Sequence, residues 1–368
     1  MTLKFVDMLI IIFKFLCCIA AFFMVGFWIF KFHENEDVSA IEYISYESHS
    51  NIIYPEMTIC INYPFIYDNL SLDSGVNVST MEYYLYILGQ SSFREEYRHI
   101  SYSNVTLNIF EYVKDINIFM RNDTFENRKH CEGIDSCPYV RFKNNFNGFI
   151  KNRITRCSGF HVNLTNAGNV EALSVGFKPE LSSILNKFSE HSLAQTFILL
   201  NYPGQILHYS EVGRPIWNNP NSSLGMYAIT VSSNEILRRR HKIESPCFSD
   251  WANFDDRVLK RHHDRVGCSP PYQNSEKPLC TSREQIADSR YDYIRMASRY
   301  YPVPCEGMSN IVFSFDKFGD AAESSTPSSP SLFITYPKTT RLVTQFKSVD
   351  LHALIGNIGG YIGLFLGK

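Results

Sequence analysis

The sequence predicts an α+β membrane protein in which a large disulfide-braced ectodomain of mixed strands and helices lies between two transmembrane helices. Three observations support this prediction: an apolar segment over residues 5–32, cysteines spread over residues 33–350, and a glycine-rich apolar segment over residues 351–368. Strand-like alternation and helix-like periodicity are mixed between the apolar segments, and no linker of distinct composition divides them. We therefore expect one ectodomain over residues 33–350.

The first apolar segment is long enough to cross a bilayer, which needs about 20 apolar residues. Lys14 can extend its amine toward the near interface, while Trp28, Phe30 and Phe32 are placed for an aromatic belt at the far interface. A signal peptide is the alternative, but its apolar region usually spans about 7–15 residues and ends in small residues. Bulky aromatic residues fill that place here, so we expect a retained transmembrane helix over residues 5–32.

The charges on either side of this helix indicate its orientation. Residues 1–4 form a short stub with Lys4, and Lys14 lies nearby, whereas three acidic residues follow the span: Glu34, Glu36 and Asp37. Basic residues on the short side favour a cytoplasmic N terminus. We expect a plasma-membrane protein with an extracellular domain, surrounded by membrane lipid.

The cysteines indicate a disulfide framework. Of ten, Cys17 and Cys18 lie in the first apolar segment, where ordinary apolar packing is expected. The other eight lie in the expected ectodomain: Cys60, Cys131, Cys137, Cys157, Cys247, Cys268, Cys280 and Cys305. Eight cysteines allow 105 pairings, so spacing alone does not assign them.

Asn-x-Ser/Thr motifs give mild support for an extracellular location, since six occur against roughly four expected by chance. The candidate glycosylation sites are Asn69, Asn77, Asn104, Asn122, Asn163 and Asn221.

Local patterns predict the following elements of the ectodomain, in chain order. Strands are expected over residues 54–61, 195–200, 225–231, 311–315 and 331–336, where alternation and strand-forming residues coincide. Capping boxes at residues 79–82 and 281–284 open two helices, one running toward Arg98 and one ending before Pro302. A third helix is expected over residues 253–265, and a flexible loop over residues 319–331.

The final apolar segment carries more glycine than a globular core helix tolerates, since each glycine costs roughly 1 kcal/mol against alanine. In a membrane, small residues four apart let helices approach closely. Gly356 and Gly360 form one such pair, and Gly359, Gly363 and Gly367 form a longer ridge. The segment ends short of a full span, so we expect the chain to stop within its second transmembrane helix, over residues 351–368.

Composition and motifs argue against two other classes of function. The net charge is −2 and the basic stretches are short, as over Arg238–Lys242, so no nucleic-acid partner is expected. We find no Gly-x-Ser-x-Gly, His-Glu-x-x-His or phosphate-binding glycine motif. We therefore expect no enzymatic activity, no cofactor and no metal.

Three stretches, at Tyr54–Cys60, Gly267–Thr281 and Asp350–Gly367, together resemble the degenerin, epithelial sodium channel and acid-sensing ion channel family. Tyr54–Cys60 is similar to the family's aromatic-Pro-x-x-Thr-x-Cys strand after the first span. Gly267–Tyr272, followed by Cys280 and Thr281, resembles its cysteine-rich block before a long helix. Asp350–Gly367, with Gly-Gly-x-x-Gly-Leu-Phe-Leu-Gly, resembles the start of its pore helix and is the most specific of the three.

The resemblance implies a homo- or heterotrimer with related subunits, whose second helices line an amiloride-sensitive pore selective for sodium ions. An extracellular stimulus opens such pores, with a peptide or a proton among the candidate ligands. It also implies four disulfide pairs: Cys60–Cys157, Cys131–Cys137, Cys247–Cys305 and Cys268–Cys280. The pore and the start of its selectivity filter would involve Gly363, Gly367 and Lys368, and Gly356, Gly359 and Gly360 would pack the pore helix.

The chain departs from the family at both ends. The family's His-Gly gating motif before the first span is absent from residues 1–4, and Lys368 occupies the middle position of its Gly-x-Ser filter. A fixed cation there would raise the barrier to Na⁺ unless its side chain points away from the axis.

Several residues have both a functional and a structural interpretation. Asp350 could concentrate cations at an outer mouth or cap the following helix. The acidic run of Glu34, Glu36 and Asp37 could also concentrate cations there, or it could simply be solvated. His262 and His263 could sense protons or be inert on an exposed helix. Cys268 and Cys280 could bind zinc with these histidines instead of forming a disulfide. Tyr83, Tyr84 and Tyr86 are expected to pack one helix face.

Three functional hypotheses follow. The first is a subunit of a stimulus-gated cation channel. The second is a non-conducting regulatory or truncated subunit, and the third is a single-pass adhesion or receptor ectodomain. The glycine-rich final segment favours the first over the third.

Overall fold

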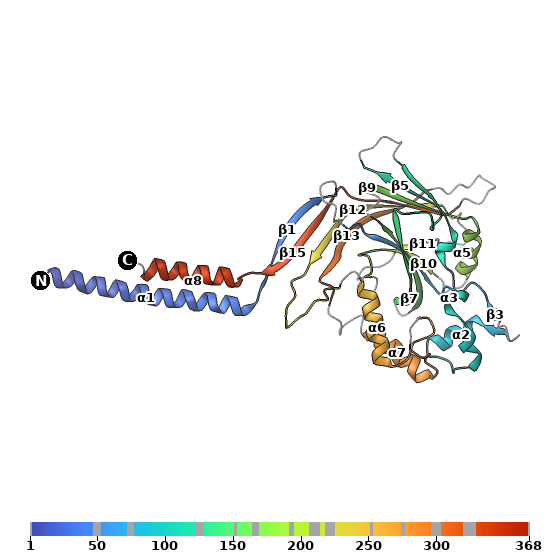
Figure 1. Ribbon diagram of the computed structural model, residues 1–368, viewed down its shortest axis with the longest axis horizontal. Coiled ribbons are helices and arrows are strands. Elements are labelled where there is room, and N and C mark those ends of the chain that lie inside the picture. The colour runs from blue at the N-terminus through green and yellow to red at the C-terminus, as the bar shows by residue number, and fades with distance from the viewer. Residues whose placement is uncertain are drawn as a thin grey trace.

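The computed structural model describes residues 2–46, 53–71, 77–121, 128–150, 153–163, 169–190, 195–205, 214–217, 225–250, 253–273, 277–295, 303–318 and 329–366. Two helices project from one end of a folded domain that is built on two β-sheets (Figure 1). The architecture is therefore of the mixed α+β class that the sequence predicts. The expected loop over residues 319–331 lies almost wholly outside the described residues.

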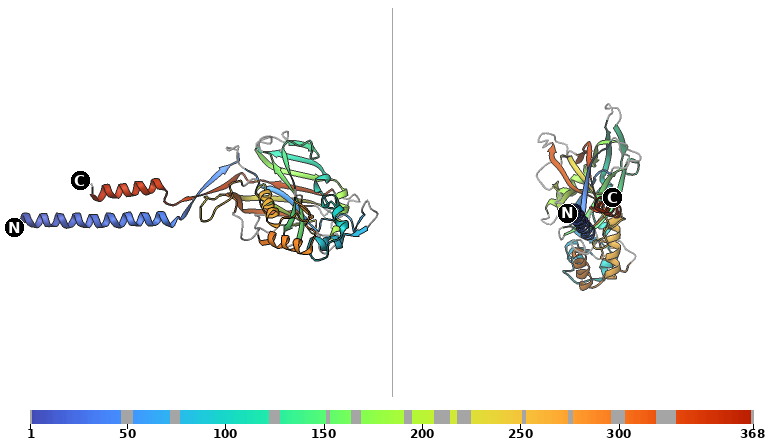
Figure 2. Two further views of the ribbon diagram at one scale, coloured as in Figure 1. Left: turned by 60° about the horizontal axis from the view of Figure 1, so that its bottom comes forward. Right: turned by 90° about the vertical axis from the view of Figure 1, so that its left-hand side faces the viewer.

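The projecting helices are α1 (Thr2–Glu34) and α8 (Leu351–Leu366), which lie side by side in both views (Figure 2). Within the described part of the chain, α1 is the one helix long and apolar enough to cross a membrane, over Met8–Glu34. The 16 residues of α8 are also apolar, but at 1.5 Å per residue they extend for about 24 Å. This length is below the roughly 30 Å of a hydrocarbon core, so α8 as described does not by itself constitute a span.

The larger sheet has eight strands and connects directly to both helices. Along the sheet the strands follow the order β1 (Asp37–Ser45), β15 (Thr339–Lys347), β12 (Met226–Arg238), β14 (Ser331–Thr335), β9 (Val170–Phe177), β5 (Val113–Met120) and β6 (Arg128–Glu132), and β13 (Glu306–Phe318) pairs with β12. β1 follows α1 and β15 precedes α8, and these two strands pair antiparallel from Asp37 opposite Lys347 to Ser45 opposite Thr339. β12 pairs in parallel with both β14 and β15.

The smaller sheet has five strands, in the order β11 (Arg214–Ile216), β10 (Gln195–Asn201), β2 (Glu56–Asn62), β8 (Arg153–Val162) and β7 (Val140–Ile150). Every residue of β2 is buried, as expected for a central strand covered on both faces. A separate hairpin joins β3 (Asn69–Ser71) and β4 (Asn77–Ser79). The strands predicted at residues 54–61, 195–200, 225–231, 311–315 and 331–336 are confirmed, and β12 and β13 are longer than expected.

The main core lies between the two sheets. It joins Ile59 and Phe160 of the smaller sheet with Ile118, Leu173 and Ile334 of the larger one, all of them fully buried. Each such side chain stabilises the fold by roughly 1.5–3 kcal/mol, which explains why the two sheets pack face to face.

The remaining described helices are α2 (Thr80–Ile87), η1 (Glu95–His99), α3 (Tyr102–Val105), η2 (Ile109–Tyr112), α5 (Glu180–Glu190), α6 (Phe254–Val266) and α7 (Arg283–Arg295). A second core cluster contains Tyr83, Tyr84 and Tyr86, so the expected packing role of these tyrosines is confirmed. The prediction that this helix runs toward Arg98 is wrong. α2 ends at Ile87 because Gly89 has a φ of +70° and lies against α7, where an added Cβ would come within 3.1 Å of the backbone of Ala287.

The two predicted capping boxes have different outcomes. Ser79 occupies the N-cap of α2, but its side chain makes no capping hydrogen bond. At α7 the box forms one residue later than predicted: Ser282 Oγ accepts from the Gln285 backbone N–H at 3.1 Å, and Gln285 Oε1 accepts from the Ser282 N–H at 3.1 Å. Ser282 and Gln285 therefore replace Thr281 and Glu284 as the reciprocal pair.

The predicted helix over residues 253–265 is confirmed as α6, which ends at Gly267 with a φ of +80°. His262 and His263 of this helix are buried, so the expectation of an exposed pair is wrong. His262 Nε2 lies 3.0 Å from Ser289 Oγ of α7, and His263 Nε2 lies 2.6 Å from Gln273 Oε1. Both imidazoles contribute to packing between α6 and its neighbours.

Four disulfides connect these elements: Cys60–Cys157, Cys131–Cys137, Cys247–Cys305 and Cys268–Cys280. They are the pairs that the family resemblance implies. Cys60–Cys157 joins β2 to β8 at directly opposed positions in the smaller sheet. The zinc alternative for Cys268 and Cys280 is wrong in this structure, because their sulfur atoms are bonded to each other.

Candidate functional site at the junction of the sheets and the apolar helices

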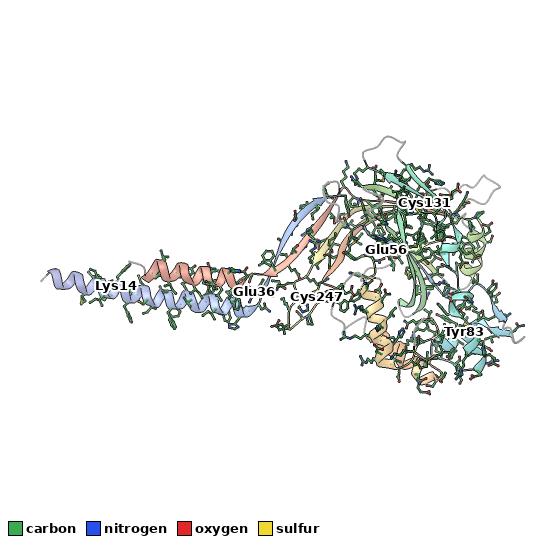
Figure 3. All side chains as sticks on the ribbon, viewed as in Figure 1. Lys14, Glu36, Glu56, Tyr83, Cys131 and Cys247 are labelled. Carbon is green, nitrogen blue, oxygen red and sulfur yellow. A yellow bond between two sulfur atoms is a disulfide. The ribbon has the colours of Figure 1, made fainter. Side chains whose placement is uncertain are left out.

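The junction between the folded domain and the two apolar helices gathers charged side chains from segments that are distant in the sequence. We define the junction as residues 32–37, 238–247 and 347–350. Figure 3 shows Glu36 and Cys247 close to the place where the helices meet the domain. These three segments are far apart in the sequence, and the sheet topology brings them together.

Helix α1 ends at Glu34, and the next residue, Asn35, has a φ of +55°. Asparagine tolerates this left-handed conformation, which turns the chain out of the helix and into β1. Arg240 fixes the turn: its Nη2 donates to Asn35 Oδ1 at 2.7 Å and to the Asn35 carbonyl at 3.1 Å. A guanidinium is also favoured here because the carbonyl end of a helix carries partial negative charge.

Asp37, the first residue of β1, pairs with two basic residues. Arg240 Nε lies 2.9 Å from its Oδ1 and Lys242 Nζ lies 2.7 Å from its Oδ2. The Asp37 and Arg240 side chains are 23% and 20% exposed, so solvent screens this pair only in part. Desolvation raises the pKa of Asp37, but hydrogen bonds and charges from Lys242 and Arg240 outweigh it and leave the pKa below its usual value.

Glu244 completes the contacts between residues 238–247 and the end of α1, because Asn35 Nδ2 donates to Glu244 Oε2 at 3.2 Å. The base of this loop is pinned by the Cys247–Cys305 disulfide and by the Arg239 N–H, which donates to the Cys305 carbonyl at 2.7 Å. We call residues 239–247 the clamp loop. It is fixed at its base by a covalent bond and along its length by polar contacts to the end of α1.

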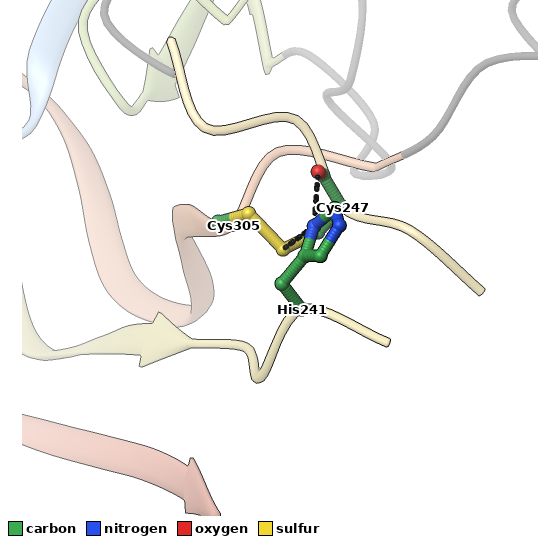
Figure 4. A group of neighbouring side chains, drawn as sticks. All are labelled: His241, Cys247 and Cys305. Carbon is green, nitrogen blue, oxygen red and sulfur yellow. Dashed lines mark hydrogen bonds between the residues drawn. A yellow bond between two sulfur atoms is a disulfide. The ribbon is translucent and has the colours of Figure 1, made fainter. Parts of the chain in front are cut away.

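His241 of the clamp loop lies beside the disulfide (Figure 4). Its Nδ1 is 3.0 Å from the Cys247 carbonyl oxygen and 3.9 Å from Cys247 Sγ, and with Cys305 the three residues form a cluster compact enough for a metal ion. A carbonyl only accepts, so Nδ1 carries the proton. Sulfur bonded in a disulfide is not a thiolate, and metal binding would require its reduction first.

The second apolar helix is tied to the same place. Asp350 Oδ1 accepts from the Ala353 N–H at 2.7 Å, so the capping interpretation of Asp350 is confirmed. The Ser348 N–H donates to the Glu36 carbonyl at 2.9 Å, and Lys347 Nζ lies 3.2 Å from the centre of the Phe32 ring. The ends of α1 and β15 are therefore held together immediately before α8 begins.

The acidic run after the first apolar segment is only partly solvated. Glu34 and Glu36 both pair with Lys31, at 2.5 Å and 3.4 Å, and Asp37 is held by the clamp loop. These partners offset the negative charge that could otherwise attract cations.

The four glycines of α8 that the structure describes do not contact α1 closely. An added Cβ at Gly356, Gly359, Gly360 or Gly363 would meet nothing within 4 Å. The close approach that these residues permit is therefore not used between α1 and α8 of one chain. Gly367 and Lys368, the expected start of the filter, lie outside the described residues.

Of the candidate glycosylation sites, Asn69, Asn77 and Asn104 are exposed, and Asn163 is half-buried with its Nδ2 donating to the Pro138 carbonyl at 3.2 Å. Asn122 and Asn221 lie outside the part of the chain that the structure describes.

Sequence reasoning missed Arg240, Lys242 and Asn35. The basic stretch over Arg238–Lys242 and the acidic run over residues 34–37 were each visible, and opposite charge was the signal that could have joined them. Comparison with protein-family models found no match to this chain, and comparison with curated proteins found none either.

Proposed function

We propose that this chain is a subunit of a trimeric, amiloride-sensitive, sodium-selective cation channel of the degenerin, epithelial sodium channel and acid-sensing ion channel family, gated by an extracellular stimulus. In this proposal α1 is the first transmembrane helix, with a cytoplasmic N terminus in the plasma membrane, and α8 belongs to the second. The resemblance over Tyr54–Cys60, Gly267–Cys280 and Asp350–Gly367 supports the assignment to this family.

One observation carries the proposal furthest: both apolar helices continue from strands that pair with each other. β1 and β15 are hydrogen-bonded along nine opposed residue pairs, and each leads within a few residues into its helix. Because a stimulus acting on the sheet would move these strands together, it would reach both helices at once. Gating by an extracellular stimulus needs such a connection.

The open glycines of α8 give a second line of support. A trimeric pore requires the second helices of three copies to approach one another, and small residues permit that approach. An added Cβ at Gly356, Gly359, Gly360 or Gly363 would meet no other part of the described chain within 4 Å, so this surface is available to other copies.

The test is electrophysiological. The complete reading frame that includes this sequence is expressed in oocytes, with surface delivery and oligomeric state measured in parallel, and the inward sodium current is recorded with and without amiloride. We expect an amiloride-sensitive current that Gly359→Leu abolishes, because the larger side chain separates the helices. The control Ile355→Val, at a 60% exposed position of the same helix, should preserve it. Surface trimers that carry no current under any stimulus tested would refute channel activity for this chain alone.

A further inference from the structure

We infer that the clamp loop rests in the phospholipid headgroup layer and that Ile243, at its tip, inserts among the lipids. This inference rests on the proposal that α1 crosses the membrane, and it adds a second contact between the protein and the bilayer. The partner of Ile243 is a phospholipid surface, because the polar contacts of the clamp loop fix its position relative to the end of the membrane helix.

The tether is the first argument. Lys242 and Glu244 flank Ile243, and both contact Asn35, the first residue beyond α1. Lys242 also binds Asp37 at 2.7 Å, two residues further along. The tip of the loop therefore cannot move away from the end of α1 without breaking these contacts. In Figures 1 and 2 the chain between β12 and α6 lies at the end of the domain from which the helices project.

Exposure is the second argument. Ile243 is 94% exposed, more than any other large apolar side chain in the described ranges. Phe22 and Phe23 of α1 are 83% and 73% exposed, and a bilayer would cover both of these side chains. A bilayer reaching the clamp loop would cover Ile243 in the same way, which accounts for an apolar residue at the tip of an otherwise polar loop.

Depth is the third argument. If Trp28 and Phe32 mark the edge of the hydrocarbon, Asn35 lies three residues beyond Phe32, or about 4.5 Å along the helix axis. The headgroup region is roughly 5–8 Å thick on each side of the hydrocarbon core. The contacts that hold the loop therefore fall inside this region, which is where an isoleucine can pass below the phosphates.

Charge is the fourth argument. Arg240 and Lys242 are both paired with Asp37, and Arg239 donates to the Pro304 carbonyl at 2.9 Å. With its basic groups engaged, the loop does not depend on anionic lipid. Binding through Ile243 should therefore occur on a zwitterionic phosphatidylcholine surface.

The experiment measures depth with a fluorophore. The full chain carrying Cys17→Ala and Cys18→Ala is labelled with NBD at Ile243→Cys without reductant, so that the disulfides remain intact, and placed in phosphatidylcholine nanodiscs. Two matched probes use Phe30→Cys on α1 and Tyr67→Cys beside β3, each replacing a side chain that is 60% exposed. β3 lies at the end of the domain opposite the helices (Figure 1).

Quenching is compared for a phosphatidylcholine with a nitroxide near its headgroup and for aqueous iodide. We expect the lipid nitroxide to quench the probes at residues 243 and 30, and iodide to quench the probe at residue 67. If iodide quenches the probe at residue 243 and the lipid nitroxide does not, the inference is overturned. Protection of the probe at residue 243 from both quenchers would also overturn it, because that result indicates that a second copy of the chain covers the loop. Failure of the lipid nitroxide to quench the probe at residue 30 would instead refute membrane insertion of α1, so the two failures are distinguishable.

Discussion

Replacing His161 with phenylalanine should make the folded domain more resistant to acid than the native chain. His161 lies in β8 directly opposite Arg141 of β7, and its Nε2 has no hydrogen-bond partner among the residues that the structure describes. Burial, together with a smaller contribution from the positive charge of Arg141, lowers the pKa of His161 from 6.5 to about 4. A charged imidazole is therefore strongly disfavoured at this position.

The size of the effect follows from proton linkage. Below pH 6.5 the histidine of an unfolded chain binds a proton, while the folded protein resists protonation until about pH 4. The stabilising contribution is therefore complete above pH 6.5 and is lost as the pH falls toward 4. At about 1.4 kcal/mol for each tenfold change in proton affinity, the total loss is about 3 kcal/mol, and most of it is reached at about pH 4.5.

Equilibrium urea unfolding of the full chain in detergent micelles, followed by the fluorescence of buried Trp217, measures this loss. Between pH 7.5 and 4.5, His161→Phe should lose about 2–3 kcal/mol less stability than the native chain. His99→Phe, which removes an exposed histidine, is the control and should keep the native acid dependence. An acid dependence of His161→Phe that matches the native one would refute the reasoning.

Three further outcomes are expected from the same unfolding measurement. Gln285→Ala should cost about 1 kcal/mol through the loss of the cap of α7, whereas Glu284→Ala should cost much less, and equal costs would contradict the observed capping box. A double-mutant cycle with Asp37→Asn and Arg240→Gln should give a coupling of about 1 kcal/mol at pH 7 that disappears as acid protonates Asp37, and a coupling that persists in acid would contradict a charge interaction. Replacing both cysteines of the Cys60–Cys157 disulfide, which closes a loop of 97 residues, should cost about 4–5 kcal/mol, and a smaller loss than for the six-residue disulfide loop would contradict the loop-entropy account.

Local patterns in the sequence were sufficient for elements whose signals are short-range. β2, β10, α6 and α7 follow from alternation, strand-forming residues, capping residues and a terminal glycine, each within about a dozen residues. The capping box of α7 was misplaced by one residue because Thr281-x-x-Glu284 and Ser282-x-x-Gln285 overlap. Both fit the motif, and only the backbone position of Arg283 as the first helical residue selects the second.

Contacts between distant segments were the part that the sequence did not predict. Arg240 and Asp37 are 203 residues apart, and they meet only because β1 and β12 each pair with β15. His262 and His263 were expected on an exposed face because α6 was considered alone, without α7 and Gln273 packed against it. Side-chain burial depends on which elements become neighbours, and strand order in a mixed sheet is not encoded in local periodicity.

The pairing of β1 with β15 has a mechanical consequence. β12 pairs with β15 only as far as Thr344, so the last three pairs, from Ser39–Gln345 to Asp37–Lys347, form a two-stranded ribbon with no third strand beside it among the described residues. Such ribbons twist more readily than wide sheets, and their hydrogen bonds run perpendicular to the strands. Forcing α1 and α8 apart would break these hydrogen bonds one residue pair at a time, beginning at Asp37–Lys347. Turning both helices together about a common axis would break none of these hydrogen bonds. Torsion is therefore easier for this ribbon than separation of the two helices, and the contacts of Asn35 and Asp37 with the clamp loop limit how far it can go.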